Sequence, residues 1–264
     1  MRYAVGIEYN GANYCGWQKQ YLKNVIGVEQ RVEEALSKVA NEPLLLTCAG
    51  RTDTGVHATA QLVHFETNAI RSEKSWVLGA NSNLPDDISV KWAVPVSDDF
   101  DARYSATARR YRYVIFNRRE RPAILREGLT QCYEPLDHEL MHQGAQYLVG
   151  EHDFSAFRSS SCESKTPCRH MTHIKVNRFG DYIVIDVQAN AFLHHMVRNI
   201  AGSLMLIGLG TQPVNWLQTL LEGKDRTVAG PTAKPNGLYL VRVIYPEKFN
   251  IPQVPMGPIF FTDD

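Results

Sequence analysis

The sequence predicts an α/β protein of the α+β type, in which two halves each run strand, helix, strand, strand, helix, strand. Three observations predict this class. Segments in which apolar and polar residues alternate, a pattern typical of strands, recur along the chain. Segments with apolar residues three and four positions apart, typical of helices, lie between them. The same order of segments then occurs a second time, so we expect one half over residues 1–107 and another over residues 108–264.

The first half starts with the alternating segment RYAVGIEY, residues 2–9, which is typical of a strand. Apolar residues at helical spacing then predict a helix, and they are Val28, Val32, Ala35, Leu36 and Val39. LLLTCAG, residues 44–50, and AQLVHFET, residues 60–67, are predicted to be two strands. A helix near residues 72–83 and a strand over residues 88–96 complete the first half.

The second half has the same order of elements. Its predicted strands are RRYRYVIFN at 109–117, RHMTHIKVNR at 169–178, DYIVIDVQAN at 181–190 and GLYLVRVIY at 237–245. Its predicted helices are 137–149, 194–207 and a shorter one starting near Pro213. This order is that of ferredoxin-like and RRM-like units, whose helices cover one face of a sheet. Two such units can form one continuous, mostly antiparallel sheet with a central cleft, where we expect a functional site.

The composition is that of an ordinary soluble globular protein. Of the 264 residues, 44% are hydrophobic and 21% are charged, and the formal net charge is zero. The longest apolar stretch, around residues 200–209, is about half of what a bilayer span requires, and the N-terminus does not read as a signal peptide. We therefore expect a cytoplasmic protein without a membrane anchor. The five cysteines include no CxxC pair, which argues against a disulfide framework and a zinc knuckle.

Positive charge is concentrated in one segment, which runs from Arg103 to Arg126. It holds eight arginines and one acid, Glu120, an excess of seven positive charges. A solvated charged face is the simplest explanation. Because every basic residue here is arginine and aromatic residues are interleaved, the segment favours a phosphate-binding surface instead.

The strand at 109–117 alternates arginine and tyrosine. Arg109 and Tyr111 lie on one face, and Arg110 and Arg112 lie on the other. Tyrosine is common in strands, so a role in the core is one explanation for Tyr111. Stacking on a flipped pyrimidine is the other, since a flat ring beside cations suits a base and its phosphates.

The segment CAGRTDTGVHATAQ, residues 48–61, holds one carboxylate, Asp53, between two threonines. Thr-Asp-Thr-Gly is a sequence that favours a turn, and a turn alone would explain these residues. A simple turn would require neither a position between two predicted strands nor Arg51 and His57 beside it. A neighbouring arginine favours the ionised carboxylate, so Asp53 is expected to act as a nucleophile or base rather than as a proton donor.

The same Asp-Thr-Gly triplet occurs in aspartic proteases, where two such loops let two carboxylates share one proton. The flanking residues here are polar, no second Asp-Thr-Gly or Asp-Ser-Gly triplet occurs, and Arg51 would oppose proton sharing. The sequence therefore argues against a protease.

HELMH, residues 138–142, matches the zinc signature H-E-x-x-H. On a helix its two histidines lie together, but opposite Leu136, Leu140 and Gly144, the side that we expect to pack on the sheet. No third ligand is evident nearby. We therefore predict two solvent-facing histidines without a metal.

The segment NAFLHHMVRNIAGSL, residues 190–204, places His194, His195 and Arg198 at the start of an otherwise apolar helix. His195 and Arg198 are three residues apart and share a face. A buried arginine requires a carboxylate partner, and no acid lies within a turn on this helix. Asp53 is a candidate partner.

In these segments the chain resembles the TruA-type tRNA pseudouridine synthases of bacteria. The matching segments are GWQ at 16–18, AGRTDTGVHA at 49–58, NLPDDI at 83–88, FDARYSATARRYRY at 100–113, FLHHMVRNIAGSL at 192–204 and GLYL at 237–240. The resemblance implies the pseudouridine synthase fold, two RRM-like halves around a positively charged cleft, and a homodimer. It implies isomerisation of uridine to pseudouridine at positions 38, 39 and 40 in the tRNA anticodon arm. It implies no metal or organic cofactor.

By the resemblance, Asp53 is the catalytic aspartate, Tyr111 the active-site tyrosine and Arg198 the basic partner of the aspartate, while Arg51 enters the stem when the target base leaves it. Attack on C1′ and a glycal route both remain open for Asp53, and Tyr111 is a candidate acceptor of the C5 proton. Further expected contacts with the substrate are His57, Arg109, Arg110, Arg112 and His195. The alternative function is a non-catalytic RNA-binding protein with two RRM-like units.

Overall fold

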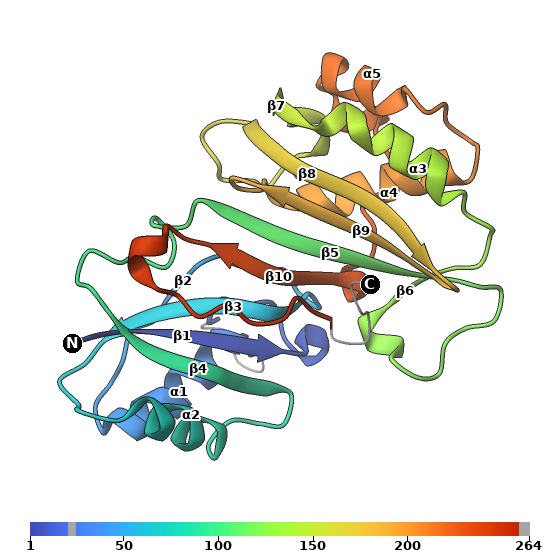
Figure 1. Ribbon diagram of the computed structural model, residues 1–264. Coiled ribbons are helices and arrows are strands. Elements are labelled where there is room, and N and C mark those ends of the chain that lie inside the picture. Colours follow the sequence, from blue (N-terminus) through green and yellow to red (C-terminus); the bar gives the residue numbers. More distant parts are fainter. Residues whose placement is uncertain (21–24, 259–264) are drawn as a thin grey trace. The chain divides into compact units, whose positions relative to one another are not determined.

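The computed structural model describes residues 1–20 and 25–258 and divides into two compact units (Figure 1). Unit 1 is Met1–Thr107 together with the chain from Tyr239 onward, and unit 2 is Ala108–Leu238. The fold is mixed α/β with mostly antiparallel strand pairs, as the sequence predicts. The second unit ends earlier than expected, because the last strand joins unit 1 instead of continuing a half that runs to residue 264.

Unit 1 contains the predicted βαββαβ order. Its strands are β1 (Arg2–Tyr9), β2 (Thr47–Cys48), β3 (His57–Glu66), β4 (Ile88–Val96) and β10 (Leu238–Ile244). The sheet order is β4-β1-β3-β10, with β10 parallel to β3 and β1 antiparallel to both of its neighbours. Helices α1 (Val28–Ala40) and α2 (Glu73–Asn81) pack on each other and cover one face of β4 and β1 (Figure 1). The apolar positions of α1 predicted from its spacing are buried, apart from Val39, which is half-buried.

Strand β2 is much shorter than the segment 44–50 predicted to form it. It pairs only with Val63 and His64. Past β2, the Ala49 N–H still donates to the Leu62 carbonyl at 2.8 Å, and the Gln61 side chain donates to the Gly50 carbonyl at 2.7 Å. The backbone of His57 and Ala58 is then open to β10, which pairs there in parallel.

The buried His64 on β3 makes the stability of unit 1 depend on pH. Its Nδ1 accepts a hydrogen bond from the Ala102 N–H at 3.0 Å, and its ring lies edge-on to Phe100. Burial lowers the pKa of His64 below its ordinary value of 6.5, although Asp101 opposes the shift. As the pH falls through 6.5, the His64 side chain binds a proton in the unfolded chain but not yet in the folded chain. We expect the free energy of unfolding to decrease from about pH 7.5 to about pH 5.5, measured by urea denaturation at each pH.

The matched variant is His64→Asn, because the asparagine oxygen lies where Nδ1 accepts but does not titrate. We expect a shallower pH dependence in this variant. Burial also lowers the pKa of His173 in unit 2, so part of the dependence should remain. If the free energy of unfolding of His64→Asn depends on pH as steeply as that of the parent, His64 is not a source of the pH dependence.

Unit 2 is built from strands with helices packed on them (Figure 1). Its strands are β5 (Ala108–Asn117), β6 (Thr130–Cys132), β7 (Gly150–Asp153), β8 (Cys168–Phe179) and β9 (Tyr182–Ala189). The order β5-β9-β8-β7 is antiparallel throughout, and β6 runs parallel to β5. Its helices are α3 (His138–Ala145), α4 (Met196–Gly208) and α5 (Trp216–Gly223). Among the described residues, no helix is long and apolar enough to span a membrane.

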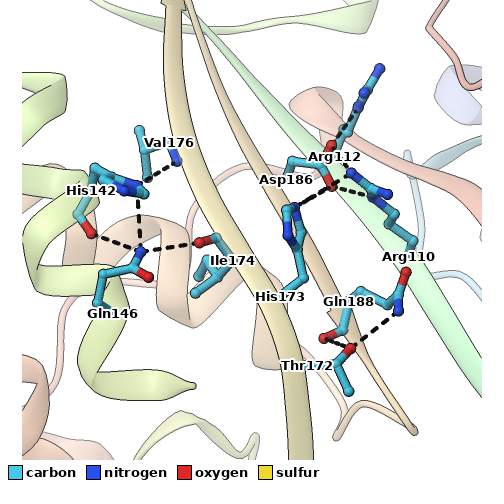
Figure 2. A network of polar contacts seen from close by, with 10 residues as sticks. All are labelled: Arg110, Arg112, His142, Gln146, Thr172, His173, Ile174, Val176, Asp186 and Gln188. Atoms are coloured by element: carbon cyan, nitrogen blue, oxygen red, sulfur yellow. Dashed lines mark hydrogen bonds and ion pairs between the residues drawn. The ribbon is translucent and has the colours of Figure 1, made fainter. Parts of the chain in front are cut away.

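The position of the HELMH segment differs from the prediction. The residues of α3 that are buried are Met141, Gly144 and Ala145, which turns His142 toward the sheet. The Val176 N–H of β8 donates to His142 Nδ1 at 3.3 Å (Figure 2). His142 is therefore half-buried and hydrogen-bonded to a strand, and the expectation of two solvent-facing histidines is wrong for it.

Candidate active site

The loop between β2 and β3 presents Asp53 on a fixed backbone. Gly55 adopts φ +76°, a conformation that favours glycine, and the Val56 N–H donates to the Asp53 carbonyl at 3.1 Å. The Thr52 hydroxyl before it is buried and hydrogen-bonded to the Tyr9 hydroxyl at 2.7 Å. The Asp53 side chain is partly exposed, so solvent reaches a carboxylate whose backbone is tied on both sides.

The GWQ segment holds this loop in place. The Trp17 N–H donates to the Thr52 carbonyl at 3.0 Å, and the Trp17 ring is fully buried beside Tyr9. Gly16 has φ +86°, and a Cβ there would lie 2.5 Å from the Thr52 carbonyl oxygen. Only glycine fits this close approach, which explains why a motif distant in sequence accompanies the aspartate loop.

Arg51 and His57, which flank Asp53 in sequence, have different surroundings. Arg51 is exposed. His57 is 3% exposed, its Nδ1 accepts from the Gly11 N–H at 3.0 Å, and its ring stacks on Tyr239. The structure thus packs His57 in the interior of unit 1, and the substrate contact expected from the sequence stays a prediction.

In unit 2, strand β5 carries Tyr111 partly exposed. Its ring lies edge-on to Phe192, with centroids 5.1 Å apart. Tyr113, two residues along the same face, is fully buried, and its hydroxyl bonds Thr130 and the Lys234 carbonyl. Tyr113 is therefore a core residue, whereas Tyr111 is only partly buried.

The opposite face of β5 carries a buried ionic network around Asp186 (Figure 2). Asp186 lies on β9 directly across from Arg112, whose Nε donates to it at 2.9 Å. Arg110 donates to both carboxylate oxygens, at 2.6 and 2.9 Å. His173 of β8 adds a contact at 3.7 Å. Burial alone would raise the pKa of Asp186, but the two guanidinium groups hold it below its ordinary value, so the carboxylate stays ionised.

This network includes two of the arginines expected to contact the substrate. Arg112 is 4% exposed and paired with Asp186, so in this structure it is an internal cation. Arg110 is bidentate on the same carboxylate with a side chain 20% exposed. One acid distant in sequence thus offsets part of the positive charge counted between Arg103 and Arg126. Arg109, on the other face, donates to the Asn190 carbonyl at 3.2 Å.

Helix α4 positions Arg198 through close packing of its first turns. A Cβ on Gly202 would lie 1.8 Å from the Pro231 carbonyl oxygen, so glycine is required there. The buried Asn199 side chain accepts from Arg226 and Thr232 and donates to the Phe157 carbonyl. These contacts explain the NIAGS part of the motif.

The segment that contains Arg226 and Thr232 also contacts Arg198. The Arg198 Nε donates to the Ala233 carbonyl at 2.8 Å, and the Ala233 N–H donates back to the Arg198 carbonyl. Burial raises the pKa of Tyr113, and the Arg198 charge opposes the rise, which puts the guanidinium near the tyrosine strand of the same unit.

His195 precedes α4 in a strained conformation. Its φ of +61° lies in the left-handed region, which a histidine rarely occupies. The rings of His194 and His195 are 4.0 Å apart, and His194 Nδ1 meets the Ser161 hydroxyl at 3.0 Å. Strain of this kind is retained where the surrounding structure fixes it, often at functional sites.

Two participants in this region were missed from the sequence. Asp186 interrupts the apolar segment DYIVIDVQAN, and a carboxylate inside such a strand signals a cation on the strand beside it. Phe192 packs on Tyr111, but nothing in its local sequence indicates that partner.

Comparison with known proteins gives consistent results. The profile of a family described as tRNA pseudouridine synthase matches residues 6–105 and 145–246. The chain is 59% identical to tRNA pseudouridine synthase A of Actinobacillus succinogenes and 60% identical to that of Pasteurella multocida, in each case over 100% of this chain and 99% of the relative. It is 61% identical to tRNA pseudouridine synthase A of Pseudoalteromonas atlantica, over 100% of both chains. Because the profile covers most of the chain and the relatives match it over its whole length, this protein belongs to the tRNA pseudouridine synthase family.

Proposed function

We propose that this protein isomerises uridine to pseudouridine at positions 38, 39 and 40 of the tRNA anticodon arm, with Asp53 as the nucleophile. The observation that carries the proposal is the GRTD loop of a pseudouridine synthase chain. Its partly exposed carboxylate follows Thr52, whose carbonyl accepts a hydrogen bond from the Trp17 N–H. The relatives are named for tRNA, which supports tRNA as the substrate.

The reaction leaves the atoms and the oxidation state of the nucleotide unchanged. The bond between C1′ and N1 breaks, the uracil turns, C5 bonds to C1′, N1 takes up a proton and C5 loses one. Asp53 assists either by attacking C1′ or as a base in a glycal route. The accessible ring of Tyr111 suits stacking on the uracil, and its hydroxyl is a candidate acceptor for the C5 proton. These steps require no metal or organic cofactor.

The cations are proposed to act at three places. Arg198 holds Asp53 ionised, and Arg51 fills the gap in the stem that the flipped nucleotide leaves. Arg109 and His195 contact the RNA, and the partly exposed side chain of Arg110 adds a weaker contact. We further propose that the protein acts as a homodimer in the cytoplasm.

A non-catalytic RNA-binding protein is the rival function. The arginines and tyrosines would serve it equally well, but Asp53 would not, because a carboxylate repels phosphate. To test the proposal, pseudouridines are mapped in tRNA from cells with and without the gene for this protein. We expect loss at positions 38, 39 and 40 alone. Unchanged modification at these positions would contradict the proposed function.

Binding to tRNA is expected to weaken with salt, because arginines that meet phosphates release counterions. Between about 50 and about 200 mM salt, the affinity for unmodified tRNA should fall at least roughly tenfold. Fluorescence anisotropy with labelled transcript measures this. An affinity independent of salt over that range would contradict a phosphate-binding role for the arginines.

A further inference from the structure

The loop that follows β4 displays one large aromatic side chain in solvent. Tyr104 is 79% exposed, and the Arg103 guanidinium lies over its ring, 5.4 Å from the centroid. An exposed ring gains nothing from burial in the folded monomer. Arginine over an aromatic face is, however, an arrangement that receives an unpaired base and its phosphate.

The loop is rigid. The Asp101 carboxylate accepts from the backbone N–H groups of Arg103 and Tyr104, each at 2.8 Å, and the Ser105 hydroxyl accepts from the Asp101 N–H at 2.9 Å. At its base, the Ala102 carbonyl accepts from the Tyr245 hydroxyl at 2.6 Å. The ring is therefore presented on an ordered backbone, which lowers the entropy cost of binding a ligand.

The loop also lies beside the strand that leads into the Asp53 loop. His64, which holds the Ala102 N–H, pairs in register with Thr47 of β2. The next residue, Cys48, lies within electrostatic reach of both Arg51 and Arg103. Burial and Glu29 raise the pKa of the Cys48 thiol to about 12, and both guanidinium groups oppose the rise. Arg103 and Arg51 thus each lie near Cys48 of unit 1.

We propose that Arg103 and Tyr104 form a nucleotide-binding platform, on which an unpaired base of the RNA next to the target uridine stacks on the Tyr104 ring while Arg103 meets its phosphate. The inference rests on the proposed function, since it assigns the occupant as single-stranded RNA of the anticodon loop. The platform contacts RNA but no reacting atom, and so acts in binding and positioning.

The experiment measures equilibrium binding of a fluorescein-labelled, unmodified anticodon-arm RNA in the Asp53→Asn background, where turnover does not interfere. We expect Tyr104→Ala to weaken binding about 5- to 100-fold, because the stacking surface is lost. Tyr104→Phe should restore binding to within about twofold, since phenylalanine stacks equally well. Tyr133→Ala, at another exposed tyrosine, is the matched control and should bind as the parent does.

Three results would contradict the proposal that Arg103 and Tyr104 form a nucleotide-binding platform. The first is binding by Tyr104→Ala within about twofold of the parent. The second is equal weakening by Tyr104→Phe and Tyr104→Ala, which would assign the effect to the hydroxyl group. The third is a changed oligomeric state of Tyr104→Ala in light scattering, which would assign the ring to a contact between protein chains. A protein that binds RNA through Tyr104 but isomerises nothing would contradict the proposed function and leave the platform intact.

Discussion

Asp53→Asn is expected to abolish pseudouridine formation while the protein still folds and binds tRNA. Asparagine preserves the size of the side chain and the turn, but it is neither a nucleophile nor a base. The rate of tritium release from tRNA labelled at uridine C5 should fall by at least roughly 1,000-fold. The affinity for tRNA, measured separately, should stay the same or rise, because a negative charge is removed.

The matched control is Asp98→Asn, which makes the same change at an exposed acid of unit 1. It should release tritium at the parent rate. If Asp53→Asn also turns over at the parent rate, Asp53 is not the catalytic group. If both variants lose activity together with their melting transition, the loss reflects folding rather than chemistry.

Asp186→Asn is expected to destabilise unit 2 by about 3–5 kcal/mol, because it leaves Arg112 buried without its counter-charge. Arg110 loses the same counter-charge and one of its two acceptor oxygens, because asparagine keeps a single oxygen. Since the pKa of Asp186 is held below its ordinary value, the carboxylate is ionised in the folded protein at neutral pH, and its contribution is lost only as the pH falls through that lowered pKa. Urea denaturation followed by circular dichroism measures the change.

Asp181→Asn is the control for this variant. Asp181 also pairs with an arginine, Arg118, but its side chain is 47% exposed. The expected loss is below about 1 kcal/mol, because solvent screens the pair. Equal stabilities of Asp186→Asn and Asp181→Asn would contradict a structural role for the buried network.

The long elements could be predicted because their periods span many residues. Strands β5 and β9 and helices α1 and α4 lie where alternation or helical spacing predicts them. Strands β6 and β7 have three and four residues, too few to show a period. Strand β10 pairs with His57 and Ala58 beyond the short strand β2, and no local pattern reveals this pairing.

The candidate site was predictable where a local motif carries the chemistry. Asp53 and Arg51 stand out because the loop residues exceed what a turn requires. The burial of Arg112 was not predictable from its own strand, because its partner Asp186 is 74 residues away and meets it only through the register of β5 with β9. His57 shows the same limit, since its role depends on the ring of Tyr239 from the last strand.

Mapping of pseudouridine at nucleotide resolution in an unmodified tRNA transcript treated with the purified protein tests the central claim most directly. We predict pseudouridine at positions 38, 39 and 40, wherever these are uridine, and none with the Asp53→Asn protein. A transcript that the parent protein leaves unmodified, or modifies only outside the anticodon arm, would contradict the claim.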